Sequence, residues 1–391
     1  MPLTQNPTDE DQLAALFADA AAHHRTLELR AGGTRRDMGA PRAADIVDLT
    51  AFTGIVDYDP PELVLTVRPA TPLAEIEKLL TEQGQMLAFE PFDPSPLFGE
   101  PAGGGTIGGA VLSGTAGSGR LTAGAPRDHL LGLTAISGRG ERFVAGGKVV
   151  KNVTGYDLPK LIAGSWGRLA AVTEMTLKVL PRPRMVRTLA IEGLSPAAAH
   201  RAMACALDGP CDISAAAHLP ADGDRPSLTL LRVQGFAPSV EARCLALPDL
   251  LRDHGRPRTL SDEEQAHWWN AVRIATPLRN APTLWRVSLP AHQSSPLIAR
   301  LDDGRGRWLM DWAGGLLWLA SDAAPDHIRA VTAELGGHAM LVRAPAELRA
   351  RIPFEHPRPS GVMALERRVR RAFDPAGIFE SGRFLDQDDA D

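Results

Sequence analysis

The sequence is poor in cysteine, and its few cysteines are badly placed for binding a metal. Its only three, Cys205, Cys211 and Cys244, are an odd number with wide spacing, and none belongs to a C-x-x-C pair. This arrangement excludes a disulfide framework and a cysteine-ligated zinc or iron–sulfur site. Any iron–sulfur cluster that works with this chain therefore belongs to another chain.

The sequence also lacks an excess of positive charge and any long apolar run. Lysine and arginine number 42 against 47 acids, a formal net charge of −5, which excludes a generally basic nucleic-acid binder. No stretch approaches the roughly eighteen apolar residues of a membrane span. The first thirty residues carry acids but no apolar core of a signal peptide. We therefore expect a cytoplasmic globular protein that binds no nucleic acid.

Glycine, in contrast, is abundant and locally concentrated. The chain has 37 glycines, and ten of them fall between Gly99 and Gly124. Each glycine costs roughly 0.5–1 kcal/mol relative to alanine inside a regular element. We therefore expect this stretch to be neither a plain helix nor a strand, but backbone that approaches a ligand closely.

Around the glycine stretch, apolar spacing predicts a mixed α+β fold. The segment 72–83 has apolar residues at helical spacing, begins with a proline and is followed by Gly84. Short runs rich in strand-forming residues lie at 63–67, 131–136 and 172–180.

A proline-rich break suggests where the chain divides. The run PRPRMV at 181–186 interrupts the pattern, and a helical tail begins near residue 346. We therefore predict three segments, 1–183, 184–345 and 346–391, of which the last returns to the first.

Two nucleotide-binding motifs are matched only superficially. Residues 103–108 spell G-x-G-x-x-G, but a proline-rich segment stands where a dinucleotide-binding fold needs a strand. The segment 114–120, GTAGSGR, is followed by Leu121, where a P-loop needs a serine or threonine for Mg²⁺. Neither motif supports its usual function here.

A turn near the N-terminus fits a pyrophosphate better. Leu27–Arg30 reads as a short strand that runs into the small residues Ala31, Gly32, Gly33 and Thr34. Consecutive backbone N–H groups in such a turn can form an anion-binding nest. Most turns of this kind are only turns, so this one gains weight from the blocks that follow it.

Five ordered blocks resemble the FAD-binding domain of the vanillyl-alcohol oxidase and p-cresol methylhydroxylase (PCMH) family. They are RAGGTRRDMG at 30–39, and the segments 67–91, 104–114, 126–132 and 146–183. The resemblance implies a PCMH-type FAD-binding domain of two subdomains, whose first loop holds the pyrophosphate and whose second lines the ribityl chain and isoalloxazine. The residues that it implies for FAD binding are Arg30, Ala31, Gly32, Gly33, Thr34, Gly105, Thr106, Gly108, Gly109, Ser113, Gly114, Gly124, Val172 and Arg383.

Further blocks in the second half resemble the FAD-binding E subunits of bacterial glycolate oxidases. They are 282–290, 309–319, 336–339 and 373–384. This resemblance implies a smaller α/β cap domain and a role in oxidising glycolate to glyoxylate. The tail departs from the family, whose members often read N-P-G before the final basic residue. This chain has Glu380-Ser381-Gly382-Arg383 there, which leaves only Arg383 as a tail contact to the flavin.

The resemblance also implies partners. They are a paralogous FAD-binding, glycolate-oxidising subunit and an iron–sulfur subunit that carries electrons toward quinone at the inner membrane. The arginine-rich segment 367–371 is one candidate surface for them, although such a segment is more often a solvated helix face. Two alternatives stay open: a self-sufficient FAD-dependent 2-hydroxy-acid dehydrogenase, and an assembly subunit without a catalytic flavin.

Attachment of the flavin is expected to be noncovalent. Relatives that bind FAD covalently carry a histidine directly after the first Gly-Gly, where this chain has Thr34. A threonine offers no nucleophilic nitrogen. The cluster of Lys148, Lys151 and Lys160 with Asn152, Tyr156 and Asp157 reads equally well as a solvated face or as a segment beside the cofactor.

No catalytic residue and no metal site can be assigned. The chain lacks the H-x-G-D-G-N-x-H block and the later E-H pair that bind a metal in related 2-hydroxy-acid oxidising enzymes. His338 stands alone, and Glu355-His356 lies in a proline-rich context. Arg286, in a strand flanked by tryptophan, could clamp a carboxylate, although an arginine on an amphipathic strand is usually structural. Whether this chain has its own site for a 2-hydroxy acid stays open.

Overall fold

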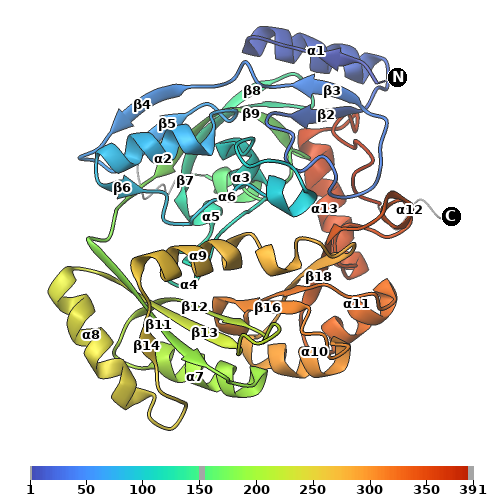
Figure 1. Cartoon of the computed structure of the whole chain (residues 1–391). Helices are drawn as coiled ribbons and strands as arrows, with labels where there is room; N and C mark the ends of the chain where they lie inside the picture. Colours follow the sequence, from blue (N-terminus) through green and yellow to red (C-terminus); the bar gives the residue numbers. More distant parts are fainter. Residues whose placement is uncertain (1, 149–154, 386–391) are drawn as a thin grey trace.

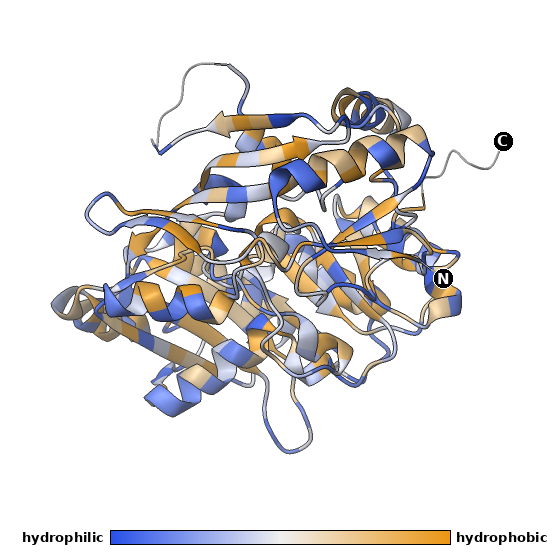
Figure 2. Ribbon diagram, turned by 90° about the horizontal axis from the view of Figure 1, so that it is seen from above, coloured by the Kyte–Doolittle hydropathy of each residue, from blue (hydrophilic) through white to orange (hydrophobic). Residues whose placement is uncertain are grey.

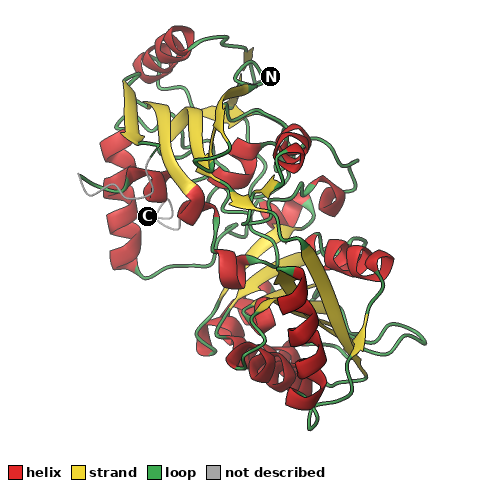
Figure 3. Cartoon of the chain, turned by 90° about the vertical axis from the view of Figure 1, so that its left-hand side faces the viewer, coloured by secondary structure: helices red, strands yellow, loops and turns green. Residues whose placement is uncertain are grey.

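The computed structural model describes residues 2–148 and 155–385. The strands among these residues form four sheets, and the chain builds two halves that lie one above the other in Figure 1. The upper half holds three smaller sheets, and the lower half holds an eight-stranded sheet with its helices (Figures 1 and 3). The α+β fold predicted from the sequence is confirmed.

An antiparallel five-stranded sheet forms the centre of the upper half. Its strands follow the order β4-β5-β9-β7-β8. They are β4 (Ile55–Asp59), β5 (Val64–Val67), β7 (Leu130–Ser137), β8 (Arg142–Gly146) and β9 (Ala170–Lys178). The long strands β7 and β9 are buried along most of their length, because helices pack on one side of the sheet and the loops of the glycine stretch lie near it.

A parallel three-stranded sheet lies beside it, in the order β1-β3-β2. It is built from β1 (Thr4–Gln5), β2 (Leu27–Arg30) and β3 (Asp45–Asp48), while a separate pair joins β6 (Gln85–Met86) to β10 (Leu180–Pro181). Helix α1 (Glu10–Ala22) begins at Asp9, whose side chain accepts the N–H of Gln12. Phe17 of this helix packs edge-on against Phe379, so the C-terminal segment shares a core with the N-terminal helix.

The sequence predicted the regular elements of this half well. The predicted helix is α2 (Leu73–Glu82), and the three predicted strands are β5, β7 and, for the most part, β9. The half also contains the short helices α4 (Arg120–Ala123), α5 (Pro126–His129) and α6 (Leu158–Ile162) and the 3₁₀ turn η1 (Ser95–Phe98).

The glycine stretch is more regular than expected. It contains α3 (Ile107–Leu112) and α4, so the prediction that it forms no helix was wrong in part. Thr106 caps α3 by accepting the N–H of Gly109. A Cβ on Gly108 would lie 2.6 Å from the Cβ of Pro69, so this glycine is required by the packing of the helix rather than by a turn.

The lower half is an antiparallel sheet in the order β14-β11-β13-β12-β16-β17-β15-β18. Its strands are β11 (Met185–Glu192), β12 (Ile213–Leu219), β13 (Leu228–Gly235), β14 (Arg258–Thr259), β15 (Leu284–Ser288), β16 (Trp308–Asp311), β17 (Leu316–Leu319) and β18 (His338–Arg343). The helices of this half are α7 (Pro196–Asp208), α8 (Ala237–Leu250), α9 (Asp262–Arg273), α10 (Ser294–Leu301), α11 (Pro325–Glu334) and the 3₁₀ turns η2 (Thr276–Leu278), η3 (Ala291–Gln293) and η4 (Trp312–Gly314).

Alternating residues give this sheet two buried faces. Trp285 and Val287 of β15 pack with α7, α8, α10 and α11, whereas Leu284 belongs to the core on the opposite face. The peripheral helices carry both hydrophilic and hydrophobic residues, as expected for helices with one buried side (Figure 2). The core on the opposite face, to which Leu284 belongs, also contains Met38 and Leu97 of the upper half, so this face of the sheet points toward the upper half.

Among the described residues, several polar contacts join the two halves, including one from Arg343 of β18 to the carbonyl of Leu97 and three near the end of the glycine stretch. Trp312 donates from its indole Nε1 to the carbonyl of Gly117 at 3.0 Å, and the hydroxyl of Ser118 donates to Asp311 at 2.8 Å. Arg232 pairs with Glu90 at 2.6 Å. All three connect the end of the glycine stretch, or the residues that pack on it, to the eight-stranded sheet.

The C-terminal segment returns to the upper half. After α12 (Ala346–Arg349), helix α13 (Ser360–Phe373) packs Val369 and Phe373 against the core of the five-stranded sheet. Among the described residues, no helix is long and apolar enough to cross a membrane. The division of the chain at 183 and 345 into domains stays a prediction.

Candidate cofactor site

The turn after β2 presents backbone N–H groups that the protein does not use. Among the described residues, the N–H groups of Gly32, Gly33, Thr34 and Arg35 have no hydrogen-bond acceptor. Gly33 has a φ of +68°, a conformation that glycine adopts at little cost. A row of unused N–H donors in such a turn can bind an anion.

The two glycine-rich segments touch through their backbones. A Cβ on Gly32 would lie 1.9 Å from the carbonyl oxygen of Gly104, and a Cβ on Gly104 would lie 2.9 Å from the methyl group of Thr34. No side chain larger than glycine's fits at this contact. The structure therefore brings together the two segments that the sequence interpretation combined.

A cavity lies over this contact, and it collects most of the residues predicted for FAD binding. They are Arg30, Ala31, Gly32, Gly33, Thr34, Thr106, Gly108, Gly109, Ser113, Val172 and Arg383.

Three of the predicted residues lie elsewhere. Gly114 lines a second, adjoining cavity, whereas Gly105 and Gly124 line neither. Gly105 packs against Asp93 and Gly124 against Asp128, each at 2.8 Å from a would-be Cβ. Packing within the protein thus accounts for both of these glycines, and their assignment to FAD binding stays a prediction.

Sequence reasoning missed several residues of the cavity wall. Arg35, Leu112, Trp166 and Gly167 line it as well. Arg35 follows the predicted turn directly and could have been included for that reason. Trp166 could not have been included on that ground, because it lies in a segment distant in the sequence. Both Trp166 and Gly167 have positive φ angles there.

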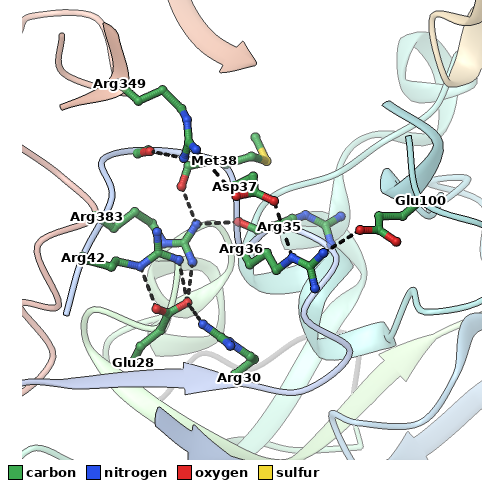
Figure 4. A network of polar contacts seen from close by, with 11 residues as sticks. Glu28, Arg30, Arg35, Arg36, Asp37, Met38, Arg42, Glu100, Arg349 and Arg383 are labelled. Atoms are coloured by element: carbon green, nitrogen blue, oxygen red, sulfur yellow. Dashed lines mark hydrogen bonds and ion pairs between the residues drawn. The ribbon is translucent and has the colours of Figure 1, made fainter. Parts of the chain in front are cut away.

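The carboxylate of Glu28, which lines the cavity, is surrounded by three arginines (Figure 4). Arg42 binds both of its oxygens, at 2.7 and 2.5 Å, and Arg383 and Arg30 approach one oxygen at 3.1 and 3.3 Å. Burial alone would raise the pKa of Glu28, but the hydrogen bond from Arg42 and the charges of the three arginines lower it below 4.5. Glu28 is therefore an anion that holds three cations in place.

Arg383 ties the C-terminal segment to the turn. One of its terminal nitrogens donates to the carbonyls of Arg35 and Met38, at 2.7 and 2.8 Å. Burial lowers the pKa of Arg383 to about 9, a value at which it still carries its charge at neutral pH. Its donors are thus engaged with the protein, so Arg383 shapes the cavity that it lines.

The cavity is electropositive. Arg30, Arg35, Arg36 and Arg383 line it, and Glu28, which is already shared by arginines, is the one acid among the described lining residues. Positive walls and free N–H donors suit the two negative charges of a pyrophosphate. The residues present therefore fit the FAD that the sequence pattern implies.

The described members of the lysine cluster and the histidine candidates form no site of their own. Lys148 pairs with Asp57, and Lys160 pairs with Asp157 at the surface, while Tyr156 is 94% exposed. Lys151 and Asn152 lie outside the described residues. His338 is exposed, and His356 accepts the N–H of Ala339. Among the described residues, no group of three histidines, cysteines or acids could hold a metal ion.

The ion cluster at Glu28 makes a testable contribution to stability. Glu28→Gln keeps the shape but removes the charge, so we expect the free energy of unfolding at pH 7 to fall by about 3–5 kcal/mol. A carboxylate with a lowered native pKa stabilises the fold above its unfolded pKa, and it loses this effect as the pH falls through the native value. The difference between the two proteins should therefore shrink below pH 4.5.

Urea unfolding across this pH range measures the difference. Glu100→Gln is the matched control, because Glu100 pairs with Arg36 at the surface with both side chains about half exposed. This change should cost less than about 1 kcal/mol. Equal losses in the two variants, or a loss in Glu28→Gln that does not depend on pH, would contradict the role given to Glu28.

Known proteins match both the fold and the sequence. The FAD binding domain family matches residues 3–146. The glycolate oxidase subunit GlcE of Escherichia coli (strain K12) is 34% identical over 364 residues, which is 91% of this chain and 92% of that protein. The glycolate oxidase subunit GlcD of Bacillus subtilis (strain 168) is 30% identical over 185 residues, 47% of this chain and 38% of that protein.

The fold has a solved counterpart in p-cresol methylhydroxylase with substrate bound. The two superpose with a TM-score of 0.68, covering 97% of this chain and 88% of that one at 15% sequence identity. This likeness confirms the PCMH-type fold inferred from the sequence, and the match to the FAD binding domain family confirms the FAD cofactor. The chain belongs to the family of the glycolate oxidase subunit GlcE.

Proposed function

We propose that this chain is the FAD-binding subunit of a glycolate oxidase complex that oxidises glycolate to glyoxylate. Its partners would be a paralogous FAD-binding, glycolate-oxidising subunit and an iron–sulfur subunit that passes electrons toward quinone at the inner membrane. The observation that carries the proposal is the similarity to GlcE, which extends over about nine-tenths of both chains. The 30% identity between this chain and the glycolate oxidase subunit GlcD of Bacillus subtilis supports a paralogous partner.

The residues around the cavity have separate tasks in this proposal. The free N–H groups of Gly33 and Thr34 would bind the pyrophosphate, with Arg35 beside them. Gly109 and Ser113 would line the flavin side, where α3 approaches the turn. FAD, when bound, supplies a two-electron acceptor for the substrate carbon. The arginine cluster around Glu28 keeps the turn in place, and Trp166 closes the cavity from the opposite segment.

FAD should be bound without a covalent bond. The hydroxyl of Thr34 accepts a hydrogen bond from Arg35 at 3.2 Å, and threonine has no nitrogen that could attack the flavin. Acid precipitation of the purified chain should release all of the yellow colour into the supernatant. Flavin that stays on the pellet would contradict this prediction.

A side chain on Gly33 should prevent flavin binding. Gly33 lines the cavity, and its would-be Cβ meets only the side chain of Arg30, at 3.7 Å, so Gly33→Val would fill space that the proposal gives to FAD. The positive φ should cost about 1–2 kcal/mol of stability. We expect a folded chain that is purified without flavin, as measured by the ratio of absorbance at 450 and 280 nm (a standard flavin reading).

Gly84→Val is the matched control for this substitution. Gly84 has a similar φ of +63°, and no other residue lies near its would-be Cβ. The control should lose similar stability and keep its flavin. Full flavin occupancy in Gly33→Val would refute the assignment of this turn to FAD.

Assembly tests the complex itself. The FAD-loaded chain, mixed with the paralogous subunit and the iron–sulfur subunit of the same organism, should co-elute with them. The mixture should reduce a quinone analogue with glycolate faster than any single subunit, because electrons need the iron–sulfur partner to leave the flavin. Separate elution would contradict the proposal, and an equal rate from this chain alone would favour the self-sufficient dehydrogenase. If a mixture that contains flavin-free Gly33→Val reduces the quinone analogue at the full rate, the alternative of an assembly subunit without a catalytic flavin is favoured.

A further inference from the structure

A second cavity adjoins the cofactor cavity on the side of the eight-stranded sheet. Arg35, Ser113 and Trp166 line both cavities, so the two share a wall. The remaining walls come from the loops at 92–97 and 114–117 and from the inward face of the sheet. A ligand in the second cavity would therefore lie next to the flavin.

Arg286 enters this cavity from the sheet. It lies on β15 in register with Trp318 of β17 on one side and Met340 of β18 on the other, and all three line the cavity. Its guanidinium carbon lies 5.0 Å from the ring centre of Trp312, and that of Arg120 lies 4.6 Å from the same ring. The tryptophan thus holds Arg286 by a cation–π contact, which leaves its N–H donors available.

The guanidinium of Arg286 forms no ion pair with a described residue, although the charge of Asp311 acts to raise its pKa. Among the residues that the structure describes, no group forms a hydrogen bond or an ion pair with it. A charged guanidinium in such a place is costly unless an anion joins it. Burial and the charge of Arg120 lower the pKa of Arg286 to about 10 against the opposing charge of Asp311, so it stays charged at neutral pH.

The one acid that lines the cavity does not neutralise this charge. Asp311 is 2% exposed, and its two oxygens accept the hydroxyl of Ser118 and the backbone N–H of Trp312, both at 2.8 Å. Burial raises the pKa of Asp311 to about 7, so the carboxyl is partly protonated at neutral pH. Arg35 and Arg273 also line the cavity, which leaves it with an excess of positive charge.

The size of the cavity limits its ligand to a few non-hydrogen atoms. Its volume is about 60 Å³, whereas one water needs roughly 10–15 Å³ by the same measure. Apart from the charged groups, most of the wall is apolar, formed by residues such as Leu97, Leu316 and Val342. A small anion with a single charged end suits these dimensions, and a guanidinium binds a carboxylate through two parallel hydrogen bonds.

We propose that Arg286 binds the carboxylate of a small monocarboxylate, of the class of two- or three-carbon 2-hydroxy acids, in this second cavity. The inference deepens the proposed function, because it gives this chain a substrate-class site of its own beside the flavin. Arg286 is the anchor of the site, and Trp312 is the positioning residue that holds the guanidinium.

Acetate is a suitable probe, because it has the carboxylate but cannot be oxidised as a 2-hydroxy acid. Titration of the FAD-loaded chain with acetate should quench tryptophan fluorescence saturably, since Trp166 and Trp318 line the cavity. Arg286→Met should weaken binding by about tenfold or more, the effect of losing a charge-assisted hydrogen-bonded pair. Arg286→Lys should be intermediate, because a lysine keeps the charge but loses the planar fork.

Arg279→Met is the matched control, since Arg279 is an exposed arginine shortly before β15, and it should bind acetate as the unchanged chain does. Without acetate, Arg286→Met should unfold at the same or a higher temperature, because it removes a partly buried charge that has no ion-pair partner among the described residues. A lower unfolding temperature would indicate a structural role and overturn the proposal. Equal acetate affinity in Arg286→Met and the unchanged chain, or no saturable binding in either, would also overturn it.

The flavin content of the same samples keeps this inference distinct from the proposed function. A chain that binds acetate through Arg286 but retains no FAD would refute the FAD-dependent function and leave the carboxylate site standing. A chain that retains FAD but binds no acetate would refute the site alone.

Discussion

The carboxylate of Glu28 is the group on which the cofactor side of the molecule depends. It lies within β2, the strand that leads into the glycine turn, and it binds Arg42 and Arg383 across gaps of 14 and 355 residues along the chain. Through Arg383 it reaches the carbonyls of Arg35 and Met38, which lie on the far side of the turn. One buried anion thereby connects the first loop of the cavity to the last described segment of the chain.

This arrangement explains why the turn can keep free N–H groups. The turn has internal hydrogen bonds, from the N–H of Arg36 to the carbonyl of Gly33 and from the N–H of Met38 to the carbonyl of Arg35, and further stabilising contacts come from outside it. Arginine side chains hold the carbonyl groups of the turn, and the backbone of Gly104 supports Gly32 from the other side. The N–H groups of residues 32–35, which line the cavity, then stay without an acceptor among the described residues, which is the preorganised state that an anion site requires.

Local signals in the sequence predicted the parts of this architecture that depend on neighbours in the chain. Helix α2 followed from apolar spacing between a proline and a glycine, and the glycine turn followed from residue size. The helix α3 was missed, because Gly108 and Gly109 argue against a helix unless their packing against Pro69 and Arg35 is known. The anchoring role of Arg383 and the isolation of Arg286 were equally out of reach, since each depends on contacts between distant segments. An arginine looks the same in the sequence whether it has an acidic partner or not.

The central claim is that the turn at residues 32–35 binds the pyrophosphate of FAD through its backbone. Hydrogen–deuterium exchange of the flavin-free and FAD-loaded chain tests this most directly, because it reports on the N–H groups themselves. Peptides that cover residues 31–36 should exchange more slowly with FAD bound, since phosphate oxygens then accept the N–H groups that have no acceptor in the protein. The exposed loop at 303–306 should exchange at the same rate in both samples. Unchanged exchange at the turn, with protection appearing only in other segments, would contradict the account.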